Sequence, residues 1–247
     1  MPAQPSAGVM PWRRAIKAAA HLAAHRENAQ KGRSTQGFLY RWEHVQAVVR
    51  LALRLAELAG ADRQVVEAAA WLHDVAKLDA EDHGQSGASA ARHILAETDF
   101  PKTKIDAVAD AIAKHVGLFT DQPVEPLEAA VLWDADKLTK LGATAVIHFC
   151  GAMIAHQGAS TKQILRQLPG SGWQEKTVVS LQTAPARAAG KARLAAFEAF
   201  YRQAAREFDG MDLTAAAEDV PPGDEDPRPP HQPQGGDGVT TSERRPI

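Results

Sequence analysis

The sequence contains almost no cysteine and no long apolar run, and these absences exclude several classes of protein. Cys150 is the single cysteine among 247 residues, so neither an intramolecular disulfide nor a cysteine-based zinc site can form. No stretch reaches about 18 consecutive apolar residues, so we expect no membrane-spanning helix. The N-terminus lacks the charged start and apolar segment of a secretion signal. A cytoplasmic location is therefore expected.

An excess of charge of either sign is also missing. Lys and Arg number 28 against 30 Asp and Glu, which gives a formal net charge of -2. This balance provides no electrostatic reason to expect a nucleic acid or an anionic membrane surface as the main partner. Hydrophobic residues make up 45% of the chain, a fraction typical of globular proteins.

Alternating strand patterns are absent as well, and the periodic segments predict helices throughout. The predicted fold class is therefore all-α. The expected helices cover residues 43–59, 62–77, 86–97, 102–116, 125–141, 143–156 and 184–208. Composition further predicts a disordered tail at 1–10, a helical domain at 11–156, a helical extension at 157–217 packed on that domain, and a disordered, Pro- and Gly-rich tail at 218–247.

Polar side chains interrupt the apolar faces of four predicted helices. A buried ionisable group is costly unless it is paired or binds a metal. Any one of these histidines alone fits a hydrogen-bonded core residue, but a group drawn from four helices favours a metal site. The inward polar residues are His44, His73, Asp74, His115 and Asp136. Two imidazoles and two carboxylates suit a divalent ion such as Mn, Fe, Co, Ni, Zn or Mg.

The order of these residues resembles the signature of the HD-domain superfamily. His44 within RWEHV, the His73-Asp74 pair within AAAWLHDVAK and Asp136 within AAVLWDADKLTKLGA match its H…HD…D pattern. The segments HGQSGASAARHIL and AIAKHVG resemble flanking segments of the family. The resemblance implies a single HD-domain helical bundle, here with a C-terminal helical annex. It also implies that His44, His73, Asp74 and Asp136 are the metal ligands of a phosphohydrolase.

On this interpretation the substrate is a small phosphate ester or anhydride, and we expect a nucleotide. Asp74 is expected to bind the metal and to accept a hydrogen bond from the attacking water. Lys77 and Lys137 are candidates for contacting phosphate, and the alternative for each is a solvated surface charge. Asp134 lies about 200° around its helix from Asp136 and fits a cap, an ion-pair partner or a support for the ligands.

Two further histidines have candidate catalytic roles. His83 stands where a predicted helix begins, and free N–H groups there favour an anion. The alternative for His83 is an exposed loop residue. His115 arrives from another helix and is a candidate acid for a leaving oxygen, whereas its alternative is a core residue.

Two other functions stay open. If His83 and His115 bind a second ion, the set resembles the dinuclear branch of the superfamily, which includes di-iron phosphohydrolases and oxygenases. The interval of ten residues between His73 and His83 is shorter than that pattern leads us to expect, so one ion is preferred. A non-catalytic nucleotide-binding module is the other option. The helical extension could wall the pocket or form a homodimer contact.

Overall fold

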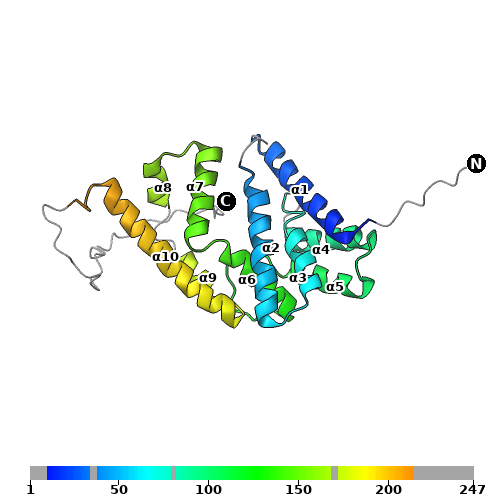
Figure 1. The fold of residues 1–247 in the computed structure, drawn as a ribbon. Coiled ribbons are helices and arrows are strands. Elements are labelled where there is room, and N and C mark those ends of the chain that lie inside the picture. Colours follow the sequence, from blue (N-terminus) through cyan, green and yellow to red (C-terminus); the bar gives the residue numbers. More distant parts are fainter. Residues whose placement is uncertain (1–9, 34–37, 79–81, 168–171, 214–247) are drawn as a thin grey trace, which may run out of the picture. The chain divides into compact units, whose positions relative to one another are not determined.

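The computed structural model describes residues 10–33, 38–78, 82–167 and 172–213, and this part of the chain is helical with no β-strand. The all-α prediction is confirmed. The elements are α1 Trp12–Gln30, α2 Tyr40–Ala59, α3 Arg63–Leu72, α4 His83–Ala96, the 3₁₀ turn η1 Lys102–Lys104, α5 Ile105–Ala113, α6 Leu127–Leu138, α7 Ala143–Gln157, α8 Thr161–Gln167, α9 Trp173–Val179 and α10 Ala184–Phe208 (Figure 1).

Local chemistry explains where the helices that carry the site begin and end. In α2, Val48, Ala52 and Leu55 are buried at helical spacing. Gly60 then ends the helix in the left-handed conformation, with φ of 76°, which glycine adopts without steric cost. The carboxylate of Asp62 caps α3 by accepting hydrogen bonds from the backbone N–H groups of Gln64 and Val65.

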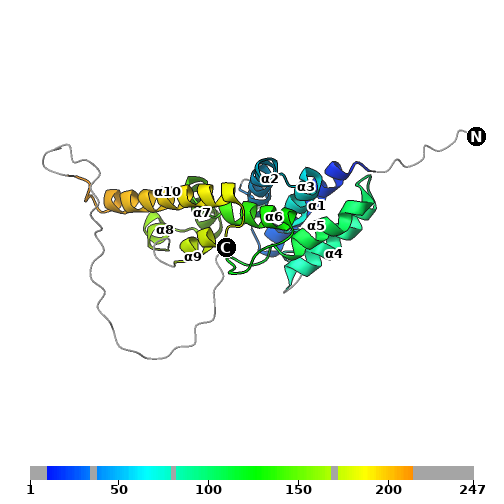
Figure 2. The ribbon, with the colours of Figure 1, turned by 90° about the horizontal axis from the view of Figure 1, so that it is seen from below.

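Helix α3 lies at the centre of the domain. It packs against α1, α2, α4, α5 and α6, and most of its residues, including Val66 and Leu72, are fully buried. Helices α4 and α5 form a closely packed pair beside it, and α2 also packs against α6 (Figures 1 and 2). A single apolar core therefore connects the helices from which the predicted ligands come.

The prediction of one helix over 62–77 is wrong at its C-terminal end. The α-helix stops at Leu72, and the following residues form tighter turns in which Val75 N donates to Leu72 O and Lys77 N to Asp74 O. The Nδ1 atom of His73 also turns back to the carbonyl oxygen of Ala70. These short bonds place His73 and Asp74 at the end of the helix, where both side chains can reach the same centre.

The helices after residue 157 include α10, which packs against α2, α6 and α7. Asp134 of α6 is fully buried, and its two carboxylate oxygens accept hydrogen bonds from the backbone N–H groups of Gln182 and Thr183, each at 2.7 Å. A second, smaller apolar cluster joins α7, α8 and α10 around Met153, Phe197 and Tyr201.

The chain divides into two compact units, Met1–Gly210 and Met211–Ile247. Apart from Met10, the predicted tails at 1–10 and 218–247 lie outside the described residues. Within the described part, no single helix is long and apolar enough to cross a membrane. Helices α6 and α7 reach such a length and composition only when taken together across a 62° bend.

Candidate metal centre

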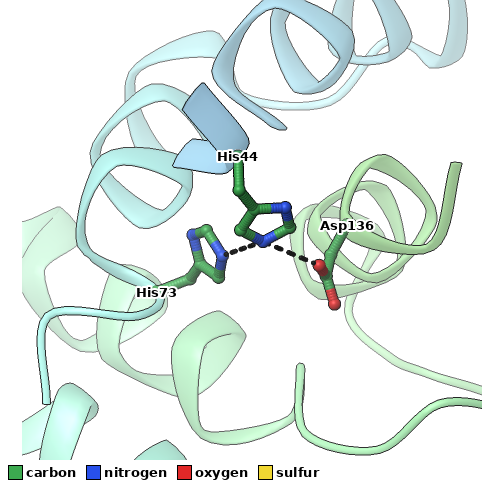
Figure 3. A group of neighbouring side chains, drawn as sticks. All are labelled: His44, His73 and Asp136. Carbon is green, nitrogen blue, oxygen red and sulfur yellow. Dashed lines mark hydrogen bonds and ion pairs between the residues drawn. The ribbon is translucent and has the colours of Figure 1, made fainter. Parts of the chain in front are cut away.

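Three buried side chains from three helices meet at one point of the core. His44 of α2, His73 at the end of α3 and Asp136 of α6 point toward one another (Figure 3). The Nε2 atom of His44 lies 3.3 Å from His73 Nε2 and 3.2 Å from Asp136 Oδ1. Atoms that bind one ion at about 2.0–2.2 Å lie roughly 3.0–3.4 Å from each other. The spacing of this triad therefore fits the coordination sphere of a single ion.

The imidazoles of this triad are held with Nε2 free to bind. His73 Nδ1 lies 2.8 Å from the carbonyl oxygen of Ala70, which can only accept, so Nδ1 carries the proton. His44 Nδ1 lies 3.3 Å from the hydroxyl of Thr139, whose own proton is donated to the carbonyl oxygen of Asp136. Burial lowers the pKa of His44 to about 3. Its Nε2 therefore presents a lone pair at neutral pH, as a metal ligand requires.

A second buried triad lies beside the first and consists of Asp74, His83 and His115. Asp74 faces both groups. Its Oδ2 lies 3.4 Å from His73 Nε2 and 3.6 Å from His44 Nε2, whereas its Oδ1 lies 3.6 Å from His115 Nε2 and 4.0 Å from His83 Nε2. The two oxygens of one carboxylate thus serve two neighbouring positions.

His115 shows that the second triad also suits a cation. Its Nδ1 donates to the carbonyl oxygen of Ile112 at 2.6 Å, which leaves Nε2 as a lone pair. That Nε2 is buried and makes no hydrogen bond within the described residues. Buried polar atoms normally have a partner, and an ion is one explanation for an atom that lacks one. Burial also lowers the pKa of His115, which favours the neutral ring with its proton on Nδ1.

Lys77 brings a positive charge to the same place. Its Nζ lies 2.9 Å from His83 Nε2 and 3.7 Å from Asp74 Oδ1, and its side chain is 36% exposed. Burial, followed by the charge of Lys77, lowers the pKa of His83 to about 4. The alternative of an exposed loop histidine is therefore wrong, because His83 is buried. Lys77 is exposed and faces Asp74, so its contact with phosphate stays a prediction.

Asp74 is held in place by a buried ion-pair chain. Arg41, at the start of α2, pairs through Nη1 with Asp74 Oδ2 and through Nε with Glu27 Oε2 at 2.7 Å. Burial by itself raises the pKa of Asp74, but the charge of Arg41 and the imidazole of His73 hold it well below its usual range. Asp74 is therefore a carboxylate at neutral pH.

Two lysines fix Asp136. Lys137 Nζ lies 2.6 Å from Oδ2, and Lys140 Nζ lies 2.5 Å from Oδ1. Lys137 is fully buried, donates to the carbonyl oxygen of His115 at 2.8 Å and lies over the ring of Trp133. A solvated surface charge is therefore the wrong interpretation of Lys137, which holds the carboxylate of Asp136 in place.

The structure brings together every residue for which the sequence predicted a metal-binding or catalytic role, namely His44, His73, Asp74, Lys77, His83, His115 and Asp136. Asp134 faces away and holds the residues before α10. Sequence reasoning missed Arg41, Thr139 and Lys140. Arg41 lies three residues before His44, and Thr139 and Lys140 lie three and four residues after Asp136. Residues at this spacing are neighbours on a helix surface, and the sequence could have identified them by it.

Comparison with known proteins identifies the segment that carries this centre. Residues 41–141 match the family model described as HD domain. This segment, which holds both triads, is similar to the HD domains that the family model describes. A stretch of 163 residues is 29% identical to a bifunctional uridylyltransferase/uridylyl-removing enzyme of Rhodopseudomonas palustris, covering 62% of this chain. The matching stretch spans only 17% of that relative's length.

Solved structures share the fold. A predicted HD superfamily hydrolase from an uncultured Thermotogales bacterium matches with a TM-score of 0.56 and 22% identity, covering 80% of this chain and 94% of that one. YpgQ of Bacillus subtilis in complex with ADP gives a TM-score of 0.56 and 19% identity, covering 83% and 100%. An HD-superfamily hydrolase of Bacillus thuringiensis gives 0.55 and 22%, covering 80% and 98%.

Proposed function

We propose that this chain is a metal-dependent phosphohydrolase that cleaves a phosphate ester or anhydride, with a nucleotide as substrate. One observation carries the proposal: lone pairs of buried imidazoles and two carboxylates converge beside the ammonium of Lys77. A divalent ion bound there would lower the pKa of a bound water molecule and neutralise charge on a phosphate oxygen. The name of the uridylyl-removing relative and the ADP in the YpgQ structure support a nucleotide.

The side chains divide the remaining tasks between them. Asp74, ionised and fixed by Arg41, accepts a hydrogen bond from the attacking water and orients it. Lys77 places a positive charge 3.7 Å from Asp74 and binds phosphate. His115 is better suited to hold an ion than to protonate a leaving oxygen, because its Nε2 carries no proton.

A two-ion centre is the second candidate, and the position of Asp74 favours it. One oxygen of Asp74 faces His44 and His73 and the other faces His83 and His115, as a bridging carboxylate does. In the one-ion form, the ammonium of Lys77 supplies the second positive charge instead. The two-ion form admits both hydrolysis and oxygen chemistry, which a measurement of oxygen uptake separates.

Metal analysis and a screen of phosphoesters and nucleotides test the proposal. Asp74→Ala is expected to lose bound metal and at least about a hundredfold in activity, because it removes a ligand and the group that orients water. Asp106→Ala is the matched control, since Asp106 is an exposed carboxylate that pairs with Arg92 outside the centre. Full metal content and full rate in Asp74→Ala would show that the site is misassigned.

Metal content distinguishes the two forms. With two ions per chain, His83→Gln and His115→Gln each lose one ion and keep the other, because the first triad stays intact. With one ion per chain, neither substitution lowers metal content. Metal-loaded protein that turns over nothing in the screen yet melts at a higher temperature with nucleotide would indicate a non-catalytic binding module.

A further inference from the structure

A pocket of about 300 Å³ opens onto Asp74 from between α1 and α4. Asp74 and Lys77 line the pocket together with Leu22 and Arg26 of α1 and Ile94 of α4. Helix α1 precedes residues 41–141, so one wall comes from outside the matched domain. A ligand in the pocket would therefore lie against Asp74 and against a helix that precedes the matched segment.

Arg26 is the polar group of this wall that is free to bind a ligand. Its side chain is exposed and makes no hydrogen bond or ion pair with the described residues. The neighbouring Glu27 is already paired: its Oε2 lies 2.7 Å from Nε of Arg41 and its Oε1 lies 2.5 Å from Nζ of Lys31. All five N–H donors of Arg26 are thus available, and a guanidinium has no acceptor of its own.

The remaining walls are apolar. Leu22 is 52% exposed, and Leu78 and Ile94 are half-buried around the same space. Apolar walls suit the flat faces of a nucleobase. A volume near 300 Å³ lies at the small end of ligand pockets, which span about 300–1,000 Å³. One nucleoside fits this size and chemistry better than a dinucleotide does.

We propose that this pocket receives the nucleoside of a mononucleotide and that Arg26 determines specificity by donating to acceptor atoms on the edge of the base. The inference rests on the proposed function, because the phosphate then lies at Asp74 and Lys77. Guanine and uracil present carbonyl oxygens to which a guanidinium donates, whereas adenine presents none, so guanine and uracil are preferred. Adenosine binds more weakly than guanosine or uridine.

Nucleoside binding tests the pocket without any turnover, because a nucleoside has no phosphate to lose. Calorimetric titration of the metal-loaded protein with guanosine, uridine and adenosine measures each Kd. Arg26→Ala is expected to weaken guanosine and uridine binding about tenfold and to remove the preference over adenosine. Arg14→Ala, which removes an exposed arginine of α1 that does not line the pocket, is the matched control. Equal affinities in wild type and Arg26→Ala would overturn the inference.

Kinetics separate this inference from the proposed function. The ratio of kcat/KM for guanosine and uridine 5′-monophosphates to that for p-nitrophenyl phosphate is expected to fall about tenfold in Arg26→Ala. Ala23→Phe, which places a ring in the pocket, lowers the same ratio further. Hydrolysis of p-nitrophenyl phosphate with an unchanged ratio overturns the pocket assignment and leaves the phosphohydrolase standing. Absence of hydrolysis of every ester overturns the proposed function, while the nucleoside titration still decides the pocket.

Discussion

The histidines at the centre are oriented by the ring nitrogen that faces away from it. Carbonyl oxygens hold Nδ1 of His73 and His115, and the hydroxyl of Thr139 holds Nδ1 of His44. Such outer hydrogen bonds fix the tautomer and the ring plane, so the Nε2 lone pairs stay aimed at one place. Only the contact to His44 comes from a side chain, and it is therefore the one that mutation can remove.

At this scale we predict the effect of removing the Thr139 hydroxyl. Thr139→Val keeps the shape of the side chain but leaves His44 Nδ1 without its partner, so metal affinity is expected to fall about tenfold or more. Chelator competition measures the affinity. Thr139→Ser keeps the hydroxyl and serves as the control. An unchanged affinity in Thr139→Val would show that the tautomer of His44 is fixed by something else.

Helix packing positions the second triad. Gly84 follows His83 in α4, and a Cβ there would lie 2.8 Å from the carbonyl oxygen of Ala113 and 2.6 Å from Cγ2 of Val116. The carbonyl oxygen of Ala113 belongs to the backbone at the end of α5, so it cannot rotate away as a side chain can. The close approach of α4 to α5 therefore depends on glycine, and it is this approach that brings His83 and His115 together.

At this scale we predict that Gly84→Ala forces the two helices apart. Overpacking of this kind is expected to lower the free energy of unfolding by about 1–3 kcal/mol and to displace His83 from Asp74. Gly190→Ala in α10 is the comparison, because its added Cβ meets the end of the flexible Leu181 side chain, 2.4 Å away. Urea denaturation measures both variants. A loss in Gly190→Ala equal to that in Gly84→Ala would contradict this account.

The whole described domain is tied together by carboxylates as well as by its apolar core. Asp134 connects α6 to the residues before α10, whereas Asp136, two residues later, faces the metal centre. Burial raises the pKa of Asp134, and the two N–H groups of Gln182 and Thr183 lower it in part. One helix thus uses opposite faces to attach the C-terminal helices and to supply a ligand.

At the scale of the molecule we predict that Asp134→Asn weakens this attachment and spares the centre. The amide keeps one acceptor but turns an NH₂ donor toward backbone N–H groups, so a loss of about 1–3 kcal/mol in unfolding free energy is expected. Thermal and urea denaturation measure the loss, with the exposed Asp110→Asn as the control. Metal content is expected to match wild type, and a loss of metal would show that α10 supports the centre directly.

The buried faces of the helices could be predicted because apolar residues recur at the helical spacing of three or four positions. Val48 and Leu55 mark the buried face of α2, and the same period placed His44 on that face. The helical period alone predicted the wrong end for α3, because hydrogen bonds to the carbonyl oxygens of Ala70 and Leu72 stop the helix before the His73-Asp74 pair. It also left Lys137 as either a phosphate contact or a solvated surface charge, because a single lysine in the sequence does not indicate its partners.

The sequence by itself determined the helical class and the set of inward histidines and carboxylates, because each depends on residues within a turn or two of one another. Only the tertiary structure decided that these residues form two triads sharing Asp74, that Lys137 is buried, and that Arg26 faces the pocket beside Lys77. Those features depend on distances between helices, and the packing of side chains far apart in the chain sets such distances.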